Sequence, residues 1–326
     1  MKPFFTISLD FELFWGVHDV FTKDEYGNNI LGARKAIPKI LKLFKQYNIH
    51  ATWATVGMLT FGNKKELLSH LPEILPNYKN PKLDVYKYLS TIGGNEKSDP
   101  YHYGYSLVRQ IEEIENMEIG SHTFSHYCCL EEQYNSNAFL SDLQASNAAF
   151  SRLGIHTTSL VFPRNQYNSS AIADASKAGF TVFRGNEDHY LYQPRATNFN
   201  KKIVRGYRLI DAYISLTGVN SSNKKVYDNN IISIPSSRFL RPTRSDGFES
   251  LRLQRILKAM NHAAANNKGF HLWFHPHNFG KNTELNIAFL EKILINFEKL
   301  KGEFGMQSLT MKDAGAISSD ILYKDK

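Results

Sequence analysis

Three short segments, far apart in the chain, end in side chains that bind metals or transfer protons. Asp10 and Glu12 follow one apolar run, His122 and His126 follow a second, and His275 ends a third. A carboxylate and two imidazoles form a donor set for a hard or borderline divalent ion. The remaining groups supply an acid and a base beside an open coordination position, which is what metal-assisted hydrolysis requires.

Strand-like segments alternate with amphipathic helical segments along most of the chain. The predicted strands are 4–9, 50–56, 118–121, 159–162, 181–184, 231–235, 270–274 and 306–309, and the predicted helices are 33–47, 138–153, 171–178, 251–265 and 284–300. Repeated strand-then-helix order predicts a parallel sheet, and this number of repeats favours a closed or nearly closed (β/α) barrel.

The candidate site residues all follow predicted strands. In a parallel barrel the C-terminal ends of the strands gather at one mouth, where the connecting loops carry the chemistry. An H-x-x-x-H pair alone is more often structural than metal-binding, but the joint placement at strand ends favours one site. Two stretches, 61–105 and 190–230, break the alternation and are predicted to be insertions within a single domain of residues 1–326.

Composition limits the classes of partner. The chain has 326 residues, 42% of them hydrophobic, and a formal net charge of +8. This charge favours anionic partners such as phosphate groups or an acidic membrane face, but no recognition motif for nucleic acid accompanies it. Asp10 and Glu12 interrupt the apolar N-terminal run, and no uncharged apolar run of about 18 residues occurs elsewhere. We therefore expect no transmembrane segment and a cytoplasmic location.

These motifs together resemble the polysaccharide deacetylase family, also called NodB homology or carbohydrate esterase family 4. The resemblance rests on D-x-E at 10–12, H-T-F-S-H at 122–126, F-P-R-N at 162–165 and H-P at 275–276, and extends to about His277. It implies a distorted (β/α) barrel of about seven strands that removes N-acetyl groups from sugars with a divalent metal, commonly zinc. Some members of the family hydrolyse other amides, including formyl groups on lipid-linked sugars and cyclic amides.

Carried over to this sequence, the resemblance gives each motif residue a role. It implies that Asp10 is the catalytic base, that Arg164 pairs with this base, and that His275 is the general acid; the implied metal ligands are Glu12, His122 and His126. His277 is the rival for the acid, because a side chain two residues later on an extended strand faces the same way. A backbone N–H near Asn165 or Gln166 would complete an oxyanion hole.

Two motifs depart from the family's usual pattern. The common first motif has adjacent aspartates, whereas here one residue intervenes and the implied ligand is Glu12. The third motif lacks the usual R-x-P-Y order, because Pro163 precedes Arg164. These departures leave the substrate more open than the class of reaction.

We therefore expect a metal-dependent hydrolase of a non-peptide amide, favoured as an N-deacetylase of an amino sugar in polysaccharide or envelope-glycan biosynthesis, with zinc as the favoured metal. The alternatives are a deformylase or cyclic-amidase relative and a glycan-binding barrel without turnover. The expected substrate is a carbohydrate or glycoconjugate. Arginines at 238, 241 and 244 follow a predicted strand and could hold a phosphate or diphosphate on its carrier; the alternative is a solvated basic loop. Trp15 is the favoured aromatic for stacking on a sugar ring, ahead of Trp273.

Overall fold

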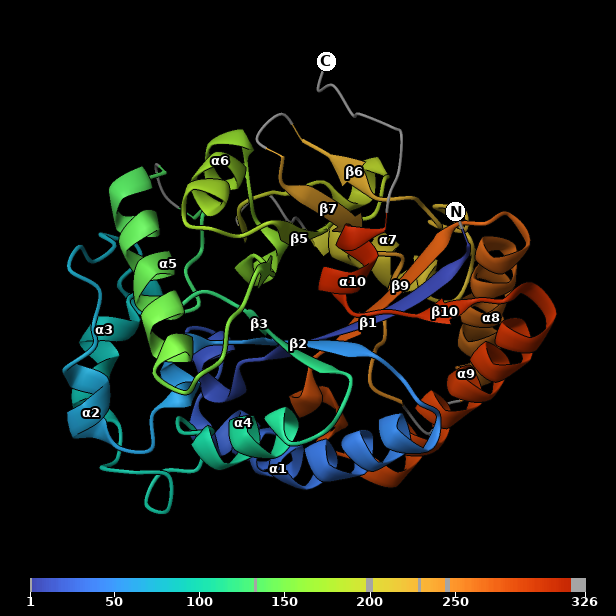
Figure 1. Ribbon diagram of the computed structural model, residues 1–326. Helices are drawn as coiled ribbons and strands as arrows, with labels where there is room; N and C mark the ends of the chain where they lie inside the picture. The colour runs from blue at the N-terminus through green and yellow to red at the C-terminus, as the bar shows by residue number, and fades with distance from the viewer. Residues whose placement is uncertain (1, 132–133, 198–201, 228–229, 244–246, 318–326) are drawn as a thin grey trace.

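A curled and largely parallel β-sheet forms the centre of the fold, with helices around its outside (Figure 1). The computed structural model describes residues 2–131, 134–197, 202–227, 230–243 and 247–317. The strands are β1 (Phe4–Phe11), β2 (Ala51–Thr55), β3 (Met117–Ser121), β4 (Ser159–Leu160), β5 (Val182–Gly185), β6 (Lys225–Val226), β7 (Ile232–Pro235), β8 (Arg238–Phe239), β9 (Gly269–Phe274) and β10 (Gln307–Ser308).

The strand order across the sheet is β6-β7-β5-β4-β3-β2-β1-β9-β8, and β10 pairs with β1. Within the described residues, only β6 runs antiparallel to its neighbour. The seven strands from β7 to β9 in this order are all parallel, and the sheet curls into a distorted half-barrel. The predicted α/β class and distorted barrel of about seven strands are therefore confirmed.

A short connection after β7 brings the two sides of the curled sheet together. The backbone N–H of Ser236 donates to the Gly185 carbonyl at the end of β5, at 2.7 Å. The next N–H, from Ser237, donates to the His271 carbonyl on β9, at 2.8 Å. Side chains at the end of β5 are thereby held close to those of β9 and of its neighbour β1.

The helices are α1 (Lys23–Gln46), α2 (Lys64–Leu68), α3 (Val85–Tyr88), α4 (Tyr105–Glu112), α5 (Ser136–Ser151), α6 (Ser169–Lys177), α7 (Lys202–Asp211), α8 (Glu249–Ala265), α9 (Thr283–Phe304) and α10 (Met311–Ala316). Helix α1 begins ten residues before the predicted 33–47, because Thr22 and Glu25 form a capping box ahead of its apolar stripe. The predicted insertions contain α2 and α3 in the first and α7 and β6 in the second. No described helix is long and apolar enough to cross a membrane.

Strand β1 lies in the middle of the sheet, and all eight of its residues are buried. Its ladder aligns Asp10 with Ala54 on β2 and Leu9 with Phe274 on β9. Because both neighbours are parallel to β1, the residues that follow their C-terminal ends share one edge with Asp10. The register therefore places His275 beside the carboxylates of β1.

Candidate metal centre and active site

Glu12 lies between two pairs of histidines at this edge of the sheet. Its Oε2 atom is 3.3 Å from Nε2 of His122 and 3.1 Å from Nε2 of His126. Its Oε1 atom is 3.7 Å from Nε2 of His275 and 3.9 Å from Nδ1 of His277. The carboxylate thus belongs to two possible donor groups, one with His122 and His126 and one with His275 and His277. Within each group the donor atoms all lie within 4.8 Å of one another. The predicted convergence of the three segments is observed.

The group of Glu12, His122 and His126 fits a divalent metal. His122 donates its Nδ1 proton to the Val161 carbonyl at 2.8 Å, so the lone pair lies on Nε2. That Nε2 atom is buried and has no hydrogen-bond partner among the described residues. A tetrahedral ion with bonds near 2.1 Å holds its donor atoms about 3.4 Å apart. The measured separations are close to this value, and burial lowers the pKa of His126 to about 4, which keeps its ring neutral.

The loop that carries both histidines has a strained backbone. Thr123 and His126 are left-handed, with φ of 63° and 59°. The buried carboxylate of Asp142 on α5 accepts the N–H of Phe124 at 2.7 Å and that of Ser125 at 3.2 Å. These bonds fix the loop so that His122 at its start and His126 near its end face the same carboxylate.

Asp10 pairs with an arginine that the sequence analysis did not identify. Arg184, at the end of β5, makes a bidentate ion pair with Asp10 through Nη1–Oδ1 at 2.6 Å and Nη2–Oδ2 at 2.8 Å. Both side chains are buried. Burial alone would raise the pKa of Asp10, but the charge and hydrogen bonds of Arg184, together with the nearby His122 and His275, outweigh it. The pKa is therefore lowered, and the carboxylate is ionised at neutral pH.

Arg164 does not contact Asp10, so the predicted Arg164–Asp10 pair is wrong. It follows Pro163 in a turn where Arg164 itself is left-handed, with φ of 57°. The turn directs its guanidinium to Asp19, at 2.6 Å, and towards Glu131, at 3.7 Å. Arg164 still borders the cavity described below.

The residue after Arg164 supports the observed pair instead. The amide oxygen of Asn165 accepts from Nε of Arg184 at 3.2 Å and from its Nη2 at 2.8 Å. The backbone N–H groups of Asn165 and Gln166 donate within the turn, to the carbonyls of Phe162 and Pro163. The expected oxyanion-hole donors are therefore already engaged in this structure.

Two neighbouring histidines differ in their access to solvent. The His275 side chain is 20% exposed and borders the cavity, whereas that of His277 is 5% exposed and burial lowers its pKa to about 3. Nε2 of His275 also lies 3.6 Å from Oδ2 of Asp10. A substrate in the cavity can therefore reach His275 before His277.

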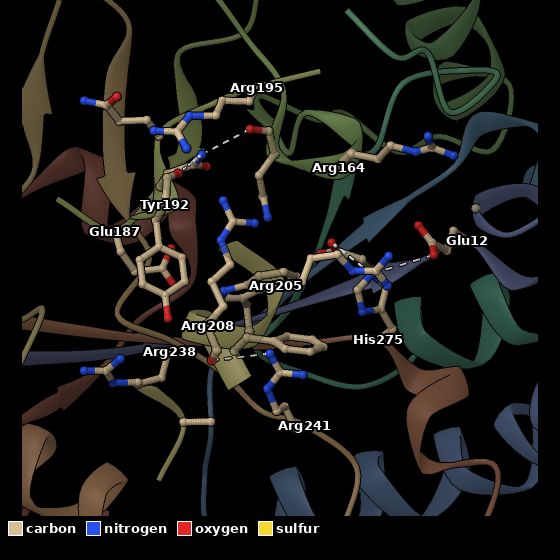
Figure 2. Close-up of a pocket in the computed structure, with 18 of the residues that line it drawn as sticks. Glu12, Arg164, Glu187, Tyr192, Arg195, Arg205, Arg208, Arg238, Arg241 and His275 are labelled. Atoms are coloured by element: carbon tan, nitrogen blue, oxygen red, sulfur yellow. Dashed lines mark hydrogen bonds and ion pairs between the residues drawn. The ribbon is translucent and has the colours of Figure 1, made fainter. Parts of the chain in front are cut away.

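A cavity of about 470 Å³ opens over these groups, within the range of about 300–1,000 Å³ that small-molecule sites occupy. Asp10, Glu12 and His275 border it on one side (Figure 2). The other lining residues include six arginines, at positions 164, 195, 205, 208, 238 and 241. The site therefore combines a carboxylate-rich floor with strongly cationic walls.

Trp273 borders the cavity, as do Tyr192 and Phe239, whereas the expectation for Trp15 is wrong. Trp15 is fully buried and its indole N–H donates to the His102 carbonyl at 2.7 Å. Trp273 borders the cavity, and the Arg184 guanidinium lies 4.3 Å from the centre of its ring. Trp273 thus contacts the arginine that pairs with Asp10 and also borders the cavity.

The arginines that face the cavity are only partly those that the sequence indicated. Arg238 is buried and pairs with Asp211 at 2.7 Å, so its role is structural, and Arg244 lies outside the described residues. Arg241 borders the cavity as predicted. Sequence analysis missed the arginines at 195, 205 and 208, since they belong to the stretch interpreted as an insertion.

Gly16 provides a direct test of the carboxylate's position. A methyl group at Gly16 would overlap the Glu12 carboxylate, so Gly16→Ala must displace this ligand. We expect Gly16→Ala to lower metal affinity about 10- to 100-fold, as loss of a ligand's supporting contact commonly does, with little change in the thermal midpoint. Metal titration of the apoprotein measures the effect. Gly94→Ala is the control, because a methyl group there meets nothing within 4 Å; equal affinities of the two variants would contradict the assignment of Glu12 as a ligand.

Comparison with known proteins agrees with this geometry. The family model for polysaccharide deacetylases matches residues 29–183, which include His122 and His126. No curated protein matches the chain. Among solved structures, a candidate polysaccharide deacetylase from Mycobacterium smegmatis is 10% identical, with a TM-score of 0.58, and the match covers 100% of this chain and 96% of that one.

Two further structures share the fold. A protein from Pseudomonas aeruginosa PAO1, also titled a polysaccharide deacetylase, is 11% identical with a TM-score of 0.56, and the match covers 96% of this chain and 88% of that one. PuuE allantoinase is 12% identical with a TM-score of 0.57 and the same coverage, 96% and 88%. Residues 29–183 match the polysaccharide deacetylase family, and the solved structures show that the whole chain shares their fold.

Proposed function

We propose that this protein is a metal-dependent hydrolase that removes the acyl group from the nitrogen of an amino sugar, with N-deacetylation favoured over deformylation. The observation that carries the proposal is the Asp10–Arg184 pair beside the Glu12 donor group, with His275 within 4 Å of both carboxylates. Polysaccharide or envelope-glycan biosynthesis in the cytoplasm is the setting that we propose, and zinc is the proposed metal.

The proposed reaction divides the work among the site's own residues. A divalent ion held by Glu12, His122 and His126 would polarise the amide carbonyl and lower the pKa of a water molecule. Asp10, kept ionised by Arg184, is placed to accept the water's proton. His275, open to the cavity, is placed to protonate the departing nitrogen, which an amide requires because its amine is a poor leaving group.

Alternatives within and outside this class make different predictions. A deformylase or cyclic-amidase relative would use the same residues on another amide. A glycan-binding barrel without turnover would need neither a buried, charge-paired base nor an accessible imidazole beside it, and the structure supplies both. The experiment is elemental analysis of purified protein, followed by assays of acetate and formate release from nucleotide-linked and lipid-linked amino sugars. Acetate release supports deacetylation, formate release favours deformylation, and release of neither contradicts both.

The cationic walls of the cavity support a phosphate-linked substrate. Among the residues that the structure describes, no carboxylate lies within 4 Å of a guanidinium nitrogen of Arg195, Arg205 or Arg208. Arg208 and Arg195 instead donate to backbone carbonyls, of Leu191 at 2.7 Å and of Tyr190 at 2.9 Å. Guanidinium groups without a carboxylate partner are suited to binding phosphate oxygens.

This part of the proposal predicts a selective change in KM. Arg205→Ala is expected to raise KM about tenfold for a sugar phosphate, because a charge-assisted hydrogen bond contributes about 1.5–3 kcal/mol. The KM for the free sugar should stay nearly constant, and raising salt from roughly 50 to 200 mM should weaken binding of the phosphate form alone. Arg205→Lys, which keeps the charge, is the matched control. Equal wild-type KM values for the two substrates would contradict a phosphate subsite.

A further inference from the structure

Helix α7 presents an apolar face to solvent beside the arginine-lined cavity. Ile203, Tyr207 and Ile210 are spaced four and three residues apart, which places them on one face of the helix. Their exposed fractions are 68%, 50% and 46%. Arg205 and Arg208 lie on another side of the same helix and border the cavity (Figure 2). One side of α7 therefore forms part of the cavity wall, and another side is an exposed apolar surface.

The apolar surface continues beyond α7 onto the start of α8. The Tyr213 ring lies edge-on to that of Phe248, with centroids 6.4 Å apart, and Arg255 of α8 pairs with Asp211 of α7 at 2.7 Å. These contacts join the two elements. We define the apolar patch as the exposed side chains of Ile203, Tyr207 and Ile210 on α7 and of Phe248 at the start of α8. Apolar side chains gathered in this way commonly mark an interaction surface.

The charges around the apolar patch indicate the partner. Residues 202–217 contain a single carboxylate, Asp211, which is buried and paired with Arg238 and Arg255. The exposed side of α7 therefore has no negative charge to repel an anionic surface, while Arg205 on the same helix and the chain's net charge of +8 attract one. A helix with an apolar face and cations on its polar side is the pattern of helices that lie in the interface of a bilayer.

We propose that the apolar patch docks on a bilayer that contains anionic phospholipids, with α7 lying in the headgroup region. Such a helix lies on the membrane and does not cross it, in agreement with the finding that no described helix could span one. Docking places the cavity beside the headgroup region, because Arg205 and Arg208 line it from the side of α7 that faces away from the apolar patch. Docking would deliver a lipid-phosphate-linked sugar to the cavity, and this consequence rests on the proposed function. The docking itself does not depend on the proposed function.

Co-sedimentation with vesicles tests the docking without any assay of turnover. We compare vesicles of phosphatidylcholine alone with vesicles in which about a third of the lipid is phosphatidylglycerol. Wild-type protein is expected to bind the anionic vesicles about tenfold more tightly than the neutral ones, and Ile203→Ser/Ile210→Ser to lose about tenfold of that affinity. Neither isoleucine borders the cavity, so hydrolysis of a water-soluble acetylated sugar phosphate should be unchanged.

The matched control replaces two similarly exposed apolar side chains on another part of the surface. Ile74 and Leu75 are 45% and 44% exposed and belong to the segment between α2 and α3, which lie at the left of Figure 1, away from α7. Ile74→Ser/Leu75→Ser should bind vesicles as the wild type does. Equal loss in both double variants would overturn the proposal, as would absence of wild-type binding to anionic vesicles. A wild-type dimer that Ile203→Ser/Ile210→Ser dissociates would also overturn it, since the patch would then bind a second copy.

The two proposals fail separately in these experiments. Vesicle binding by a protein that releases neither acetate nor formate would keep the docking surface and reject the enzyme. Turnover of a soluble sugar without vesicle binding would keep the enzyme and reject the docking surface.

Discussion

Asp10→Asn is expected to lower kcat by about 10²- to 10⁴-fold, the range that a general base contributes, while leaving metal content unchanged. In the proposed reaction Asp10, which is buried, ionised and paired with Arg184, accepts a proton and does not hold the ion. Asparagine keeps the shape of the side chain and removes its basicity. Steady-state kinetics and elemental analysis of the same preparation measure the two effects.

The arginines supply the control for this prediction. Arg184→Lys keeps the buried charge but loses the bidentate geometry, and should lower kcat. Arg164→Lys should affect kcat much less, because Arg164 pairs with Asp19. A larger loss in Arg164→Lys would restore the pairing that the family motif implies. If Asp10→Asn proves to be metal-free, the roles of Asp10 and Glu12 are exchanged.

Removal of the metal is expected to abolish hydrolysis, by about 10³-fold or more, because the ion contributes several kcal/mol of charge stabilisation in the transition state. Dialysis against a chelator, followed by addition of zinc or cobalt, tests this. The fold should survive, since the donor groups lie at the loop edge of the sheet and not in its core. His126→Ala and Glu12→Ala should each lower metal occupancy sharply.

His277→Ala distinguishes the two donor groups that share Glu12. Loss of the ion in His277→Ala with retention in His126→Ala would place the metal between Glu12, His275 and His277. Retention of the ion but a larger loss of turnover than in His275→Ala would make His277 the acid. Full activity in metal-free protein would reject the site as a metal centre.

The order of strands and helices could be predicted from the sequence because each element carries its own pattern. β1 is mostly apolar, since it is buried in the centre of the sheet, and α1, α8 and α9 have apolar positions at helical spacing. Parallel topology then collects the strand ends at one edge. That rule was sufficient to bring Asp10, Glu12, His122 and His275 together before any coordinates were known.

The partner of Asp10 could not be predicted in this way, because it depends on how far the sheet curls. Arg164 follows β4, and Arg184 lies near the end of the neighbouring β5. The left-handed turn at Arg164 directs its side chain away from Asp10, so that Arg184 forms the pair. One signal was present: Arg184 ends an apolar strand, and a buried guanidinium requires an anionic partner.

Helix α7 was missed for a different reason. Its apolar residues are exposed and not packed on the sheet, and its surroundings are rich in Asn, Lys and Tyr, so the stretch was interpreted as an insertion. A periodic pattern indicates an amphipathic helix but does not say what covers its apolar face. The arginines at 195, 205 and 208 were overlooked with it, although they supply much of the charge in the cavity.

The left-handed residues at the site have a consequence for how this protein can evolve. Thr123 and His126 lie within the segment that carries both histidine donors, and Leu13 directly follows Glu12; all three have positive φ. Each such residue costs about 1–2 kcal/mol relative to an ordinary backbone conformation, a large share of the small net stability of a folded chain. Selection for stability alone would relax these positions, whereas selection for turnover keeps them strained. Heat-stable homologues that retain these conformations should therefore recover the lost stability through substitutions at distant positions in the core. Lineages that lose the reaction should lose these conformations first.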